Sequence, residues 1–204
     1  MKTLLKKLFP PRLRRKILDS LNNLWSFFCR LMPLQNRVLF FTVRADGKLL
    51  DNAKAVYDEL DAKKIIFAKM LPHPMKIKPK IYYYLLTSRV IVTDDYVRYV
   101  RFTKLREGQK LFQIWHACGA FKKFGLDAET VLTEREERAS HAQYSAVAVT
   151  GESCKKAYAQ AFGISEDICL PIGLPRTDML FKDVDKLRAS VYEKPPEFIG
   201  KKIY

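Results

Sequence analysis

Six short apolar runs, separated by stretches with helical periodicity, constrain the fold of this chain more than any other feature. Each run has the length of a strand and is apolar on both faces, which is typical of strands buried within parallel sheets. Strands that alternate with helices predict an α/β domain with a doubly wound, mostly parallel sheet. The runs cover residues 37–43, 64–68, 89–93, 111–115, 145–150 and 168–172.

The stretches between these runs carry helix signals. Asp51 is positioned to cap a helix, and apolar residues from Ala53 to Leu60 then recur at the spacing of its inward face. Gly163 follows another periodic stretch and predicts its end, because glycine readily adopts the left-handed conformation found after helices. Further helices are expected over residues 81–86, 133–141, 152–161 and 184–192.

The first 35 residues form a basic segment that differs from the rest of the chain in charge and in apolar pattern. Residues 1–33 hold eight Lys or Arg, and Asp19 is their only acid. Between Pro11 and Pro33 the apolar residues recur at helical spacing, which predicts an amphipathic helix. The longest run without a charge, residues 20–29, is far shorter than the roughly 20 residues of a membrane-spanning helix. The pattern favours a helix lying on an anionic membrane surface; the alternative is a helix packed on its own domain or on a partner.

The whole chain is strongly basic, with a net charge of +15 and a pI near 9.7. Such a balance predicts an anionic partner: nucleic acid, a membrane surface or a phosphate-rich substrate. No nucleic-acid-binding motif is recognisable, so we expect no nucleic acid partner. The four cysteines lack metal-ligand spacing and indicate free thiols in a reducing compartment, and no metal site is expected.

The candidate for chemistry is a histidine at the end of an apolar run. His116 follows residues 111–115, and Gly119, Lys122 and Lys123 come soon after it. Ligands of open α/β sheets bind at the carboxyl ends of strands, and a neutral imidazole there can act as a general base. We expect Gly119 to allow close approach of a phosphate, with a short following helix offering its N–H groups. The alternatives are a structural histidine and two solvated lysines.

Four stretches resemble one known family when they are taken in order. Residues 51–55 (DNAKA) are similar to the family's D-N-P-K-A, and a strand at 89–93 follows a tyrosine-rich helix. Residues 113–125 (QIWHACGAFKKFG) are similar to Q-x-W-H-G…K-K-x-G, and residues 173–178 (GLPRTD) to G-x-P-R-N-D. Together they resemble the CDP-glycerol glycerophosphotransferase family, which primes or polymerises teichoic acids. The resemblance covers about residues 36–204, with Ala53, Ala117 and Thr177 as departures.

The resemblance implies a Rossmann-like amino-terminal domain of a glycosyltransferase-B-type fold. We therefore expect a membrane-association segment at 1–35, the acceptor-side domain at 36–192, and the start of a truncated second domain at 193–204. In the family, the carboxyl-terminal domain supplies most of the donor site. We therefore expect a donor-binding domain as the missing partner of this chain; the alternative is a non-catalytic fragment that keeps membrane and acceptor binding.

The resemblance also implies an activity and its residues. The expected reaction transfers glycerol phosphate or ribitol phosphate from a CDP-alditol to a lipid-linked acceptor, at the cytoplasmic face of a bacterial membrane. No cofactor is expected beyond the donor, CDP-glycerol or CDP-ribitol. From the residues alone, Asp51 and Asn52 could be only a helix cap, and Arg176 and Asp178 only an intramolecular pair. His116 is the expected base, and the expected substrate-binding residues are Asp51, Asn52, Gly119, Lys122, Lys123, Arg176 and Asp178.

Overall fold

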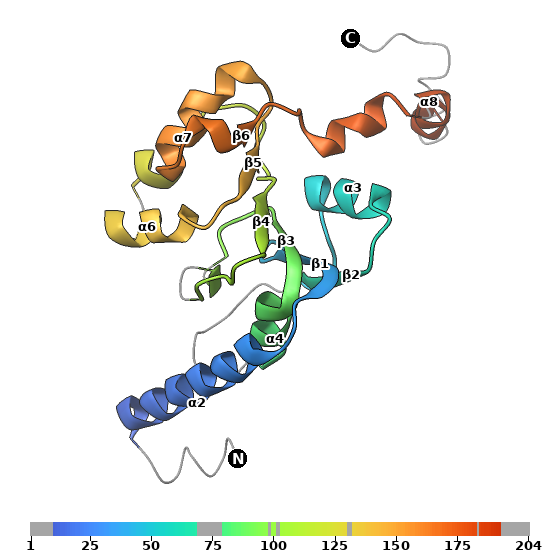
Figure 1. Cartoon of the computed structure of the whole chain (residues 1–204). Helices are drawn as coiled ribbons and strands as arrows, with labels where there is room; N and C mark the ends of the chain where they lie inside the picture. Colours follow the sequence, from blue (N-terminus) through green and yellow to red (C-terminus); the bar gives the residue numbers. More distant parts are fainter. Residues whose placement is uncertain are drawn as a thin grey trace.

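A computed structural model describes residues 10–68, 79–97, 99–100, 103–129, 132–182 and 184–192. Expectations for the first nine residues, for the proline-rich stretch 69–78 and for residues 193–204 lie outside the described part. Within that part, six parallel strands form one sheet in the order β2-β1-β3-β4-β5-β6 (Figure 1). The strands are β1 (Gln35–Thr42), β2 (Lys64–Ala68), β3 (Ser88–Thr93), β4 (Lys110–Gln113), β5 (Ala146–Ala148) and β6 (Cys169–Leu170).

Helices cover both faces of this sheet, so the predicted doubly wound α/β fold is confirmed. Leu39 and Phe41 of β1 point into one core cluster, and Phe40 points into the other, because successive side chains of a strand face opposite sides. The first cluster packs under α4 and α7, the second under α3. The helices are α2 (Pro11–Leu31), α3 (Asp51–Glu59), α4 (Pro79–Thr87), α6 (Glu134–His141), α7 (Lys155–Phe162) and α8 (Val184–Tyr192), with short 3₁₀ turns η1 (Gly125–Asp127), η2 (Glu152–Cys154), η3 (Glu166–Ile168) and η4 (Pro175–Leu180).

The strand order reverses next to β1. From β1 the chain passes through α3 to β2 on one side, and then through α4 to β3 on the other. Loops at the carboxyl ends of β1 and β3 therefore leave toward opposite faces of the sheet, and ligands of doubly wound sheets bind at such a reversal point. A functional site is expected at this edge.

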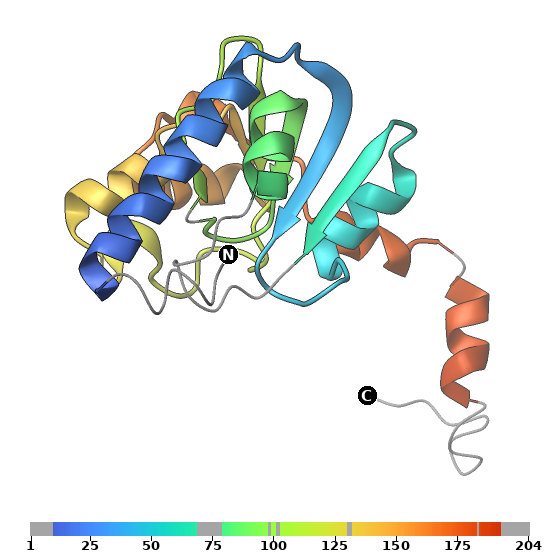
Figure 2. The same ribbon diagram turned by 90° about the horizontal axis from the view of Figure 1, so that it is seen from below.

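The amphipathic helix is confirmed as α2, and it lies beside α4 (Figure 2). Its inner face buries Cys29, and the indole N–H of Trp25 donates to the carbonyl oxygen of Pro79 at 2.8 Å. The opposite face leaves large apolar side chains in the open, with Phe27 56% and Leu31 68% exposed. The helix thus packs on its own domain and still displays an apolar stripe. No helix in the described ranges combines the length and the hydrophobicity that crossing a bilayer requires.

Two local expectations need correction. The fourth strand ends at Gln113, before the predicted Trp115, because Trp115 adopts a positive φ of 41° that a strand cannot contain. Asp51 is the first residue of α3 and does not cap it; the N-cap is Leu50, and no side chain caps the helix. By contrast, Gly163 ends α7 in the left-handed conformation, with φ 63°, as predicted.

Candidate active site

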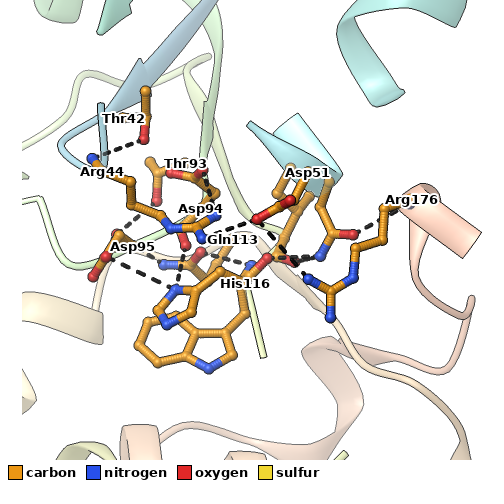
Figure 3. A network of polar contacts seen from close by, with 12 residues as sticks. Thr42, Arg44, Asp51, Thr93, Asp94, Asp95, Gln113, His116 and Arg176 are labelled. Atoms are coloured by element: carbon orange, nitrogen blue, oxygen red, sulfur yellow. Dashed lines mark hydrogen bonds and ion pairs between the residues drawn. The ribbon is translucent and has the colours of Figure 1, made fainter. Parts of the chain in front are cut away.

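Polar side chains from five separate segments meet at the carboxyl edge of the sheet (Figure 3). Arg44 follows β1, Asp94 and Asp95 follow β3, and His116 follows β4. The other two segments are the first turn of α3 and the beginning of η4, which follows β6. This is the edge at which the strand order reverses, so the fold itself gathers these residues.

His116 is held in a defined orientation. Its Nδ1 lies 2.9 Å from the carbonyl oxygen of Asp94 and 3.8 Å from Oδ2 of Asp95. A carbonyl oxygen only accepts hydrogen bonds, so the neutral ring carries its proton on Nδ1 and presents a lone pair at Nε2. The imidazole can therefore take a proton at Nε2, and the Asp95 carboxylate can stabilise the resulting positive charge.

Trp115 supports this histidine. The indole stacks on the imidazole with ring centroids 4.5 Å apart, and it also packs against the rings of Phe124 and Phe162. A left-handed conformation is strained for a bulky residue, and strained residues that persist in folded proteins cluster at functional sites. Phe124 belongs to the K-K-F-G motif, so that motif packs against the indole that stacks on the histidine.

Asn52 braces the same turn from the side of α3. Its side chain is fully buried; Nδ2 donates to the carbonyl oxygens of Trp115 at 2.9 Å and Ile114 at 3.3 Å. Its Oδ1 accepts from the backbone N–H of Arg176 at 3.2 Å. The predicted role in substrate binding needs correction, because the amide is inaccessible and both of its ends are occupied. Asn52 instead ties two of the motifs together.

Asp51 sits between two guanidinium groups. Its Oδ2 lies 2.9 Å from Nη2 of Arg44 and 3.9 Å from Nη1 of Arg176. Arg44 also reaches the fully buried carboxylate of Asp94, with 3.5 Å between Nη1 and Oδ2. Burial raises the pKa of the Asp94 carboxyl above its ordinary value, and the Arg44 charge opposes that shift only in part.

The partner of Arg176 is thus Asp51 and not the neighbouring Asp178 that the sequence had suggested as an alternative. Asp178 is exposed and lines a pocket of about 830 Å³ that opens between α3 and η4. Asp51 and Arg176 line the same pocket, together with apolar side chains such as Ile172 and Met179. Three predicted substrate-binding residues therefore border one space that is large enough for a small-molecule ligand.

Gly119 and the two lysines are arranged differently from the expectation. Gly119 has a positive φ of 62°, but its N–H donates to Oγ1 of Thr150 at 3.0 Å. No helix begins there among the described residues: the next element is the three-residue turn η1, so the expected helical phosphate cradle is wrong. Lys122 and Lys123 are exposed beside a separate pocket of about 190 Å³. Their part in substrate binding stays a prediction.

Sequence reasoning missed Arg44, Asp94 and Asp95. Each follows a strand, which is a usable signal, but only the strand order makes their loops neighbours of the His116 loop. The described residues contain no cluster of three or more His, Cys, Asp or Glu side chains arranged to hold a metal.

Comparisons with known proteins agree with the motifs. The family model described as CDP-Glycerol:Poly(glycerophosphate) glycerophosphotransferase matches residues 24–195. A teichoic acid poly(ribitol-phosphate) polymerase of Bacillus spizizenii is 28% identical over 94% of this chain and 33% of its own length. The ribitol-phosphate polymerase TarK of Staphylococcus aureus is 29% identical over 83% of this chain and 36% of its own. This chain thus spans about a third of the length of these curated relatives.

A solved structure shares the fold. The wall teichoic acid polymerase TagF superposes with a TM-score of 0.67 at 15% identity, over 89% of this chain and 51% of that one. The relatives also include a teichoic acid glycerol-phosphate primase of Bacillus subtilis, 30% identical over 52% of this chain and 29% of its own. The family match extends across α3, the His116 turn and η4, which are the segments that build the site. This chain therefore belongs to the CDP-glycerol:poly(glycerophosphate) glycerophosphotransferase family.

Proposed function

We propose that this chain provides the acceptor-side half of a polyol-phosphate transferase. The donor would be CDP-glycerol or CDP-ribitol, and the acceptor a hydroxyl at the end of a lipid-linked teichoic acid or a related polymer. The observation that carries the proposal is the Nδ1 contact of His116 with Asp94, which leaves Nε2 as a proton acceptor. Because the chain spans only about a third of its relatives, the proposal assigns the donor nucleotide to a second domain.

In this proposal His116 acts as the general base. The acceptor oxygen attacks the phosphorus that carries the alditol, a new O–P bond forms, and the bond from that phosphorus to the oxygen of CMP breaks. The hydroxyl proton passes to Nε2 of His116, and CMP leaves with the electron pair of the broken bond. Asp95, 3.8 Å from Nδ1, stabilises the imidazolium. A positioned base of this kind accelerates a reaction about 10²–10⁴-fold.

Replacing His116 with alanine tests the assignment. With CDP-glycerol or CDP-ribitol, a lipid-linked acceptor and a donor-binding domain supplied, we expect release of CMP to fall about 10²–10⁴-fold, because the base is gone. Added imidazole should restore part of the rate, and circular dichroism should report an unchanged fold. Undiminished release would exclude His116 as the base. Acceptor binding without any release by the unaltered chain would instead favour the second candidate, a non-catalytic fragment.

We further propose that α2 holds the protein on an anionic bilayer at the cytoplasmic face. The apolar stripe described above, on a segment rich in Lys and Arg, supports this reading, because interfacial helices combine these two features. Each basic residue near an anionic surface contributes on the order of 1 kcal/mol. In this proposal the net charge of +15 serves binding to the anionic membrane and to a poly(polyol phosphate) acceptor, not to nucleic acid.

Flotation with vesicles that contain anionic lipid tests the stripe. Phe27→Glu is expected to weaken vesicle binding about 10- to 100-fold, because burial of one such side chain is worth about 1.5–3 kcal/mol. Asn23→Glu is the matched control, since it adds the same charge at an exposed position of the same helix. An equal loss for both variants would show attraction by charge alone and contradict a buried apolar stripe.

A further inference from the structure

We infer that Gln113 is a positioning residue that fixes the orientation and the tautomer of His116. The inference rests on the role proposed above for His116, but it concerns the ring itself and can be tested without turnover. Gln113 is the last residue of β4 and its side chain is fully buried, so it cannot touch a substrate. It acts through the two loops that surround the histidine.

The Gln113 side chain joins the loop after β3 to the loop after β4. Its Nε2 donates to the carbonyl oxygen of Asp95 at 3.2 Å, and its Oε1 accepts from the backbone N–H of Trp115 at 2.9 Å. A backbone carbonyl only accepts and a backbone N–H only donates, so these partners determine which end of the amide is which. One loop supplies the carbonyl that faces Nδ1 of His116, and the other carries the imidazole. Gln113 therefore sets the distance between them.

A buried chain of polar groups from α6 and the turn after it holds Gln113 in turn. Nε2 of Gln113 also lies 3.0 Å from the hydroxyl of Tyr144, which lies 3.0 Å from Nδ1 of His141. His141 Nε2 is 3.0 Å from Oε1 of Glu137. Burial lowers the pKa of His141 and raises the pKa of Tyr144, so both are neutral near pH 7. In that state Tyr144 donates to Nδ1 and His141 donates from Nε2 to Glu137, which leaves the Tyr144 oxygen to accept from Gln113.

The backbone between Gln113 and His116 needs this support. Trp115 has a φ of 41°, a conformation that a bulky side chain leaves readily unless its surroundings impose it. Gln113 binds the N–H of Trp115 while Asn52 binds its carbonyl oxygen, so two buried amides grip the two sides of one strained residue. Without the Gln113 contact, we expect Trp115 to relax toward the extended region and the imidazole to leave the Asp94 carbonyl.

Long-range ¹H–¹⁵N spectra of the ¹⁵N-labelled full chain read the tautomer of each of its three histidines directly. In the unaltered chain, His116 should carry its proton on Nδ1 and His141 on Nε2. In Gln113→Met, which keeps the size but loses the amide, we expect His116 to become a mixture of both tautomers. The signal of His141 should stay in its Nε2–H form and so serves as an internal reference.

Gln109→Met is the matched control. Gln109 is also nearly buried, at 8% exposure, and its Nε2 donates to the carbonyl oxygens of Leu85 and Ser88. It precedes β4 at the opposite edge of the sheet, so its loss should lower stability without changing the His116 tautomer. If Gln113→Met does not fold, Gln113→Asn serves instead, because its side chain is one methylene shorter and cannot reach both loops at once.

Two results would overturn the inference: an unchanged Nδ1–H signal of His116 in a folded Gln113 variant, or an equal change in Gln109→Met. Where the chain releases CMP, kcat should also fall about 10- to 100-fold in Gln113→Met with KM nearly constant, since a displacement of about 1 Å costs that much. Absence of CMP release would count against the proposed function alone, because the spectra decide the positioning role independently.

Discussion

Replacing Gly125 with alanine is expected to lower the free energy of unfolding by about 3–5 kcal/mol. Gly125 has a φ of 55°, and a Cβ on it would lie 2.1 Å from the carbonyl oxygen of Ala161 in α7. The left-handed conformation costs a non-glycine residue about 1–2 kcal/mol, and the collision with a backbone atom adds the cost of moving the helix. Gly125 of the K-K-F-G motif therefore allows the backbone of α7 to approach closely.

Urea denaturation measures this effect, and the melting temperature should fall by roughly 10–15 °C. Gly47→Ala is the matched control: its φ of 72° imposes the same strain, but no atom lies within 4 Å of the added Cβ. We expect it to cost about 1 kcal/mol. Similar losses for the two variants would contradict the close approach of Gly125 to α7.

Replacing Asn52 with leucine is expected to cost about 3–5 kcal/mol, because three backbone groups lose their partner at once. These are the carbonyl oxygens of Ile114 and Trp115 and the N–H of Arg176, all within 3.3 Å of the Asn52 amide. Each polar group left buried and unpaired costs about 1–3 kcal/mol, and leucine offsets only part of that by its apolar surface. Stability in urea and the fluorescence of Trp115 report the change.

A second buried asparagine provides the control. Asn22 of α2 is 8% exposed, and its Oδ1 has no hydrogen-bond partner in the described part of the chain. Asn22→Leu removes an oxygen that is desolvated without compensation, so we expect a neutral or slightly stabilising effect. A large loss in Asn22→Leu, or none in Asn52→Leu, would refute the distinction drawn between the two amides.

Much of the fold could be predicted from the sequence, because its signals are local. Runs such as residues 89–93 have the short length and the β-branched content of buried strands, and Gly163 marks a helix end by its own conformational freedom. The strand ends were less predictable. Trp115 continues an apolar run in the sequence, yet its backbone is left-handed and its N–H donates to the Gln113 side chain at 2.9 Å. The periodicity of the sequence contains no sign of this turn.

The site was predictable only where a motif marked it. His116, Asp51 and Arg176 lie in motifs, and the structure brings them to one edge of the sheet. Arg44 and Asp95 lie in no motif that we recognised, and their relation to His116 depends on which strands are neighbours, a long-range property. Asn52 was identified as functional for a different reason from the one the structure supports: a polar residue in a motif can serve the backbone as well as a ligand.

The position of α2 determines how far this helix lies from His116. Its last turn joins β1 at the amino edge of the sheet, whereas His116 follows β4 at the carboxyl edge. The eight residues of β1 separate the two edges by about 25 Å. A ligand that is anchored next to the last turn of α2 must therefore extend over this distance before its free end reaches the imidazole. The length of such an anchored ligand, and not only the chemistry of its free end, thus becomes a criterion for what this site can bind.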